Sequence, residues 1–175
     1  MKNIRFELEK IKDDVVELKF IINESNILAF NQNGDCRTAR WDFKGIVDYF
    51  TENLVNIMKE DEFPFDVDGV TAAELDNNVS SLDWDSMSID EMEENYERQY
   101  NWRQKHSWLH AANGAILPDV FFRRVGTNIE ISWWTSDLYD GVEFIDDNNC
   151  AYVNSNDFSE TIKKFIRDYK MLTMR

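Results

Sequence analysis

The pattern of apolar and polar positions changes period several times along the chain, and each change predicts a different element. A period of two, typical of a β-strand, runs through Val16, Leu18, Phe20 and Ile22. Shorter apolar runs at 4–8 and 27–30 predict strands on either side, with polar turns between them. Residues 4–31 are therefore expected to form an antiparallel meander, and the polar stretch 31–40 a loop.

Two segments change to a period of three to four, which predicts helices with one buried face. The first covers 42–59, with Asp42 as N-cap and a stripe formed by Phe43, Ile46, Val47, Phe50, Leu54, Ile57 and Met58. The second is the last helix of the chain, expected to be capped by Asp157 with Glu160. Its stripe comprises Phe158, Ile162, Phe165, Ile166 and Tyr169.

A third and longer helix is predicted from Ser88 to about Ala112. Ser88 is followed three residues later by Glu91, which is the signature of a capping box. Before it, residues 66–87 form the least regular stretch, with a short helix expected near 71–77. We expect the segment 60–87 to be partly mobile.

The stretch 106–134 predicts a helix end, a turn and a β-hairpin. Asn113-Gly114 can close a helix, and Gly126-Thr127 suits a two-residue hairpin loop. The implied register pairs Arg124 with Ile129, Phe122 with Ile131, Val120 with Trp133, Phe121 with Ser132 and Arg123 with Glu130.

Two further short strands, at 142–145 and 150–153, are expected to form a C-terminal hairpin. Together these elements indicate an α+β fold, in which an antiparallel sheet packs with three main helices. The sequence has no repeat or low-complexity linker, so residues 1–175 are expected to form a single domain.

The stretch 106–134 also resembles an uncharacterised bacterial segment. The resemblance rests on His106, Ala111, Gly114, Pro118-Asp119, Phe122-Arg123-Arg124, Gly126 and Ile129-Glu130-Ile131-Ser132-Trp133. It is to domains that accompany zinc peptidases of the ImmA/IrrE type in phage-defence and mobile-element settings. The peptidase itself needs His-Glu-x-x-His, whereas this chain has Ser107 in place of the glutamate. The resemblance therefore implies a defence-associated setting and no protease activity.

Charge is the most unusual global feature. The chain carries 19 Lys and Arg against 34 Asp and Glu, a net charge of −15. Fourteen of the acids lie between Glu60 and Glu97, where there is no Lys or Arg. Such a one-sided field disfavours nucleic acid and anionic membranes, and it favours either simple solubility or a basic partner.

Composition places the protein among folded cytoplasmic proteins. Hydrophobic residues make up 43% of the chain and aromatic residues 14%, which argues against disorder. No apolar run approaches the roughly 20 residues of a membrane span, and the charged start does not resemble a signal peptide. Cys36 and Cys150 have no metal-type spacing and are expected to be reduced thiols.

The helix–hairpin junction offers two candidate sites. His106 and His110 are four residues apart, so on one helix they would share a face as a zinc site requires, although Arg103 on that stripe disfavours a metal ion. The alternative is a half-buried polar stripe. A small-anion pocket is the second candidate, formed by Arg103, His106, His110, Arg123, Arg124 and Trp133, with Trp102, Trp108 and Trp134 nearby. Its alternative is internal pairing, Arg123 with Glu130 and Arg124 with Asp119.

Other chemistries find little support. Asp66-Val67-Asp68-Gly69 resembles a calcium loop, but Pro64 and Leu75 stand where an EF-hand needs acids. The sequence has no Gly-x-Ser-x-Gly elbow and no glycine-rich phosphate loop.

The pattern favours a non-enzymatic interaction module without a cofactor, of an immunity-like, antitoxin-like or regulatory kind, that binds a basic protein. The acids expected to contact the partner are Asp83, Asp85, Asp90, Glu91, Glu94 and Glu97. A metal- or anion-binding sensor or enzyme built on His106, His110 and Arg103 is the alternative hypothesis.

Overall fold

The N-terminal strands pair as the alternating pattern predicts. In the computed structural model, which describes residues 4–174, β1 (Ile4–Lys12) runs antiparallel to β2 (Val15–Ile22). The short strands β3 (Ser25–Asn26) and β6 (Ala39–Trp41) also pair with β2. Because alternate side chains share one face of a strand, Val16, Leu18 and Phe20 are all fully buried.

The prediction of a loop at 31–40 is wrong. This stretch holds most of β4 (Phe30–Gln32), all of β5 (Asp35–Arg37) and the start of β6. A turn at Asn33-Gly34, where both residues have positive φ, connects β4 to β5. These strands are mostly exposed, so they lack the apolar alternation on which the sequence reading depended. The strand expected at 27–30 is also shifted, since Ile27 and Leu28 lie buried in a turn.

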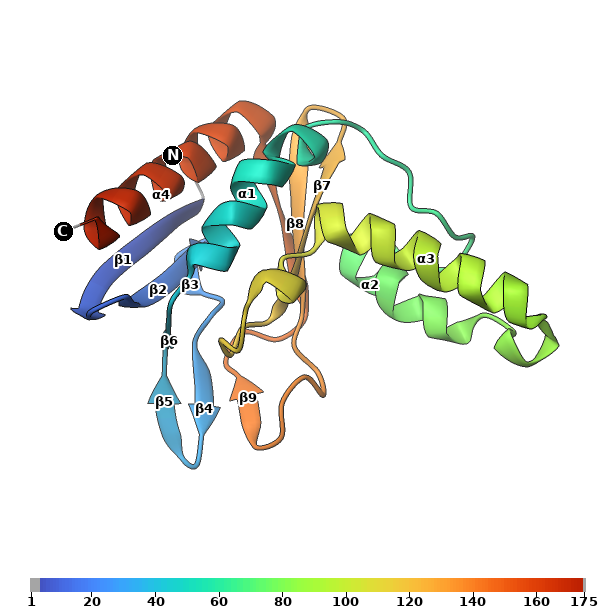
Figure 1. Cartoon of the computed structure of the whole chain (residues 1–175), viewed down its shortest axis with the longest axis horizontal. Coiled ribbons are helices and arrows are strands. Elements are labelled where there is room, and N and C mark those ends of the chain that lie inside the picture. The colour runs from blue at the N-terminus through green and yellow to red at the C-terminus, as the bar shows by residue number, and fades with distance from the viewer. Residues whose placement is uncertain (1–3, 175) are drawn as a thin grey trace.

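Two helices cover the β1–β2 pair. α1 (Lys44–Ile57) and α4 (Ser155–Thr173) lie side by side across this part of the molecule (Figure 1). The Asp42 carboxylate accepts a hydrogen bond from the Lys44 N–H at 2.9 Å, although Phe43 occupies the N-cap position. α4 begins before the expected Asp157, because Asn154 is its N-cap and accepts a hydrogen bond from the Asn156 N–H.

The central hairpin has the predicted register. β7 (Asp119–Val125) and β8 (Asn128–Trp134) bring together all five expected residue pairs. Gly126 adopts φ +59° in the two-residue loop, a left-handed conformation that glycine tolerates without strain.

The last two strands exist, but they do not form a hairpin with each other. β9 (Val142–Phe144) pairs with β4, whereas β10 (Asn149–Asn154) pairs with β8. The described residues thus contain three antiparallel sheets, and β9 joins the C-terminal half of the chain to its N-terminal half. The local sequence pattern predicted these two strands, but their pairing partners are determined by tertiary contacts with β4 and β8.

The long helix ends earlier than predicted. α3 spans Ile89–His106 and begins with the expected Ser88 capping box. Ser107 is extended and bridges Phe121, and the Trp108 N–H donates to the Val120 carbonyl at 3.3 Å. Pairing with β7 therefore interrupts the helix, and only a 3₁₀ turn, η3 (Leu109–Ala111), follows.

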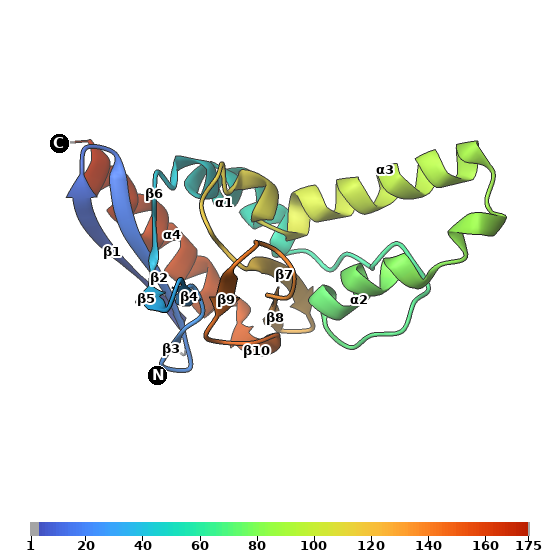
Figure 2. The ribbon, with the colours of Figure 1, turned by 90° about the horizontal axis from the view of Figure 1, so that it is seen from below.

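The segment before α3 is more regular than expected. It contains α2 (Ala72–Asn78), opened by a Thr71–Glu74 capping box, and the 3₁₀ turns η1 (Val79–Ser81) and η2 (Trp84–Ser86). α2 and α3 both project from the remainder of the fold, and Gln99 of α3 donates to Asp76 of α2 at 3.0 Å (Figures 1 and 2). We call residues 72–100 the acidic arm. No helix within residues 4–174 is both long and apolar enough to cross a bilayer.

Candidate functional site

Arg103 lies at the base of the acidic arm and is fully engaged. Its guanidinium donates to the Asp76 carboxylate and, at 2.6 Å, to Asp119 Oδ2. Burial alone would lower the pKa of Arg103, but Asp119 and Asp76 together raise it. Burial also raises the pKa of Asp76, although Arg103 and Gln99 oppose this shift. Arg103 therefore joins α2, α3 and β7 and is not free to hold an external anion.

The two histidines do not share a helix face, so the premise of the zinc hypothesis is wrong. His106 is the last residue of α3, whereas His110 lies in η3 with its ring edge-on to Tyr49. Residues 4–174 contain no group of three or more His, Cys, Asp or Glu side chains that could hold a metal ion. Burial, followed by the positive charge of Arg103, lowers the pKa of His110.

His106 instead anchors the segment that connects α1 to α2, through a contact with Asp61. The buried ring stacks on Trp102, with Nδ1 lying 2.8 Å from the Phe122 carbonyl oxygen and Nε2 lying 3.0 Å from Asp61 Oδ2. Both ring nitrogens thus lie within hydrogen-bond distance of oxygen atoms from other parts of the chain. Asp61, one of the fourteen clustered acids, therefore pairs with a buried histidine, although its side chain remains 38% exposed.

The hairpin arginines also have internal partners. Arg123 donates to Glu130 Oε2 at 2.6 Å, as the pairing alternative predicts. Arg124 donates to the carbonyls of Gly126 and Met58 instead of pairing with Asp119. Trp133 is buried within the core, so this set of residues contributes packing and structural ion pairs at the junction.

The buried Glu130 carboxylate also docks α2. Its Oε1 accepts the Ala72 N–H at 2.6 Å, and the neighbouring Ser132 hydroxyl oxygen accepts the Ala73 N–H at 3.1 Å. A helix N-terminus leaves such N–H groups without partners inside the helix, and its dipole favours a negative charge there. The hairpin thereby fixes the base of the acidic arm.

The six acids expected to contact a partner are all exposed, and they lie on η2, on α3 and beside η2 in the acidic arm. They are Asp83, Asp85, Asp90, Glu91, Glu94 and Glu97. Of these, Glu91 also caps α3: it accepts the Ser88 N–H at 2.7 Å, and this hydrogen bond lowers the pKa of the carboxyl.

Exposed apolar and aromatic side chains also lie on α3, close in sequence to these acids. Ile89 is 73% exposed, and Tyr96 and Tyr100 are each 62% exposed. Tyr96 stacks on Trp84 with ring centroids 5.0 Å apart, so its ring is held in place while remaining accessible. The acidic arm therefore combines negative charge with aromatic surface, a combination that the charge count alone did not reveal.

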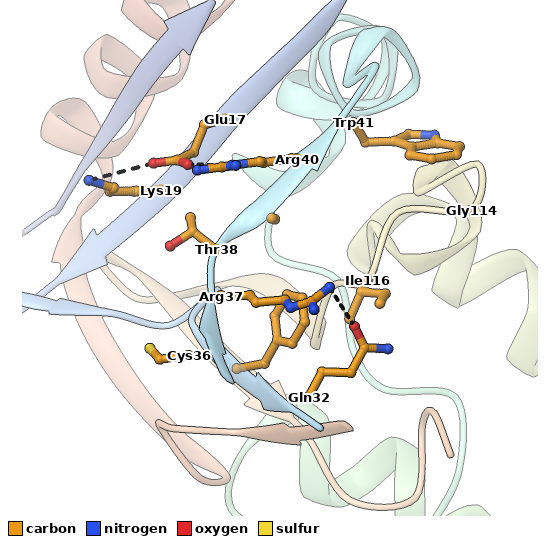
Figure 3. Close-up of a pocket in the computed structure, with 12 residues that line it drawn as sticks. Glu17, Lys19, Gln32, Cys36, Arg37, Thr38, Arg40, Trp41, Gly114 and Ile116 are labelled. Carbon is orange, nitrogen blue, oxygen red and sulfur yellow. Dashed lines mark hydrogen bonds and ion pairs between the residues drawn. The ribbon is translucent and has the colours of Figure 1, made fainter. Parts of the chain in front are cut away.

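A hollow at the opposite end of the molecule was missed because the sequence reading assigned 31–40 to a loop. It is lined by residues of β2, β4, β5 and β6 and by Gly114 and Ile116 (Figure 3). The clustering of Arg37, Arg40 and Trp41 within five residues was the available signal.

Comparison of the chain with protein-family models, with curated proteins and with solved structures finds no match.

Proposed function

We propose that the protein is a non-enzymatic interaction module that binds a basic protein partner through the acidic arm. The observation that carries this proposal is the exposed surface formed by six acids together with Ile89, Tyr96 and Tyr100. Carboxylates attract lysine and arginine, and tyrosine rings bind the same cations through their faces. The partner surface is therefore expected to be rich in arginine or lysine.

The rigid base of the acidic arm supports the same function. Arg103 and Glu130 tie α2 and α3 to the central hairpin, so the arm has a defined orientation before any partner arrives. A surface ordered in advance loses less conformational entropy on binding than a flexible acidic tail. The resemblance of 106–134 to defence-associated domains favours an immunity-like or antitoxin-like role, which the neighbouring genes would test.

The decisive experiment compares two variants that each remove six negative charges. The arm variant changes Asp83, Asp85, Asp90, Glu91, Glu94 and Glu97 to the corresponding amides. The control changes six exposed acids elsewhere, namely Asp13, Glu24, Asp137, Asp140, Glu143 and Asp147. Partners captured by cross-linking in cells would be identified by mass spectrometry and then purified for binding measurements.

We expect the arm variant to weaken binding at least tenfold and the control variant to leave it nearly unchanged. Affinity for the wild-type protein should also fall as salt rises, because exposed charges are screened. Equal losses in both variants would show that net charge alone matters, and a salt-insensitive complex would contradict the proposal.

A further inference from the structure

The hollow beside β6 has a local charge opposite to that of the whole molecule. It has a volume of about 570 Å³, within the usual range of small-molecule sites. Its lining includes three cations, Lys19, Arg37 and Arg40, and one acid, Glu17, in a chain whose net charge is −15. We call this hollow the edge groove.

One buried carboxylate orients the cations on one side of the edge groove. Glu17 is opposite Arg40 in the β2–β6 pair and accepts its Nε–H at 2.7 Å. The Glu17 side chain is only 11% exposed, whereas that of Arg40 is 60% exposed. Within residues 4–174 the terminal nitrogens of Arg40 make no hydrogen bond, so an oriented guanidinium keeps donors for an incoming anion.

Arg37 supplies a second guanidinium, on the side of β6 that faces Gly114 and Ile116 (Figure 3). Among residues 4–174, the polar contacts of its side chain are a 3.3 Å hydrogen bond to Gln32 and a 3.6 Å ion pair with Asp35, both long. It is therefore available for a stronger, charge-assisted pair with an anion.

Trp41 supplies a fixed aromatic surface on this same side. Its Nε1–H donates to the Asn113 carbonyl at 2.9 Å, and a methyl group at Gly114 would lie 3.4 Å from Cζ2 of the indole. Even so, the residue remains 43% exposed. A ring that is already held in place loses little entropy when a second ring stacks on it.

We propose that the edge groove binds a nucleoside monophosphate, with its base against Trp41 and its phosphate at Arg37. The two residues are four positions apart, about 13 Å along an extended chain. A base and a phosphate separated by a ribose suit that spacing better than a compact anion does. Arg40 and Lys19, across β6, add the positive potential that draws the anion to this end of the molecule.

The test uses calorimetric titration of the full chain with AMP, GMP, CMP and UMP. Ribose 5-phosphate, the unmodified nucleosides and inorganic phosphate serve as partial ligands. We expect at least one nucleotide to bind at least tenfold more tightly than any partial ligand. No binding by any of the four at about 1 mM, or equal binding of inorganic phosphate, would overturn the proposal.

Variants separate the two contacts. Arg37→Met should weaken nucleotide binding at least tenfold and leave nucleoside binding unchanged. Trp41→Leu should weaken nucleoside and nucleotide binding together, and Trp41→Phe, which keeps a ring and the fold, should retain most of both. Arg5→Met, at an exposed arginine on β1, is the matched control and should bind normally. Nucleotide binding that survives Arg37→Met unchanged would contradict the assignment.

Discussion

At the residue scale, polar groups buried at the base of the acidic arm hold it to the hairpin. Asp76 and Asp119 are both buried, and Arg103 is the cation that faces both carboxylates. From the sequence, Arg103 was a candidate for an anion pocket. Its two carboxylate partners could not be predicted, because Asp119 and Asp76 reach it only through tertiary folding. The Arg123–Glu130 pair was predictable, since hairpin register alone determines it.

Replacing Arg103 with methionine should therefore be strongly destabilising. The substitution leaves two buried carboxylates without their cation, and breaking such a pair typically costs about 3–5 kcal/mol. Urea denaturation would measure the loss. Arg167→Met is the control: Arg167 is exposed and pairs with neighbouring Asp168, so it should change stability by about 1 kcal/mol or less. Similar losses in the two variants would argue against a structural role for Arg103.

Asp76 should make stability depend on pH in a specific direction. Burial raises the pKa of the folded carboxyl above its ordinary value of 3.8, so the folded state keeps the proton to higher pH than the unfolded state. The stability that this group contributes is present below pH 3.8 and is lost as pH rises through the folded pKa. In urea unfolding from pH 3.5 to 7, Asp76→Asn should therefore gain stability relative to wild type as pH rises; parallel curves would contradict this.

At the element scale, α1 closely approaches η3 and the turn that follows it. Gly45 lies in the first turn of α1, and an added methyl group there would overlap the Ala111 carbonyl oxygen and press against Asn113. The apolar periodicity predicted this helix well, but it could not predict that residues 111–113 pack against its first turn.

Gly45→Ala should consequently destabilise the protein, although alanine is the better helix former by about 1 kcal/mol. Overpacking usually costs about 1–3 kcal/mol, and here the obstacle is backbone that cannot rotate away. Thermal denaturation would compare it with Glu52→Ala at an exposed site of the same helix, which should be close to neutral. An increase in stability for Gly45→Ala would show that the backbone at Ala111 and Asn113 shifts to accommodate the methyl group at little cost.

The docking of α2 gives a second prediction at this scale. Glu130→Gln keeps the side-chain shape but removes the charge that faces the N-terminus of α2 and pairs with Arg123. Losing a charge-assisted buried hydrogen bond costs about 1.5–3 kcal/mol, so amide hydrogen exchange in α2 should accelerate. Exchange in α4 should not change, and exposed Glu143→Gln should leave both helices unaffected. Uniform acceleration across the chain would instead indicate global destabilisation.

At the scale of the whole molecule, the sequence predicted the fold class and most elements, while it missed how distant segments combine. The α+β class, the central hairpin and the capped start of α3 follow from local periodicity and turn chemistry. The pairing of β4 with β9 and the termination of α3 at His106 depend on partners far along the chain. The six acids expected to contact a partner are exposed, whereas Asp76 is buried against Arg103 and Asp61 pairs with His106.

The position of α4 has a consequence for synthesis on the ribosome. Phe165 stacks on Phe6 at 4.3 Å, so the apolar side of β1 stays uncovered until residues 155–173 have left the exit tunnel. The nascent N-terminal strands therefore keep this apolar surface exposed until α4 packs on it. During that time they are candidates for chaperone binding. Arrest-peptide force measurements should detect one late folding event after α4 emerges, and a strong signal before α4 is translated would contradict this order.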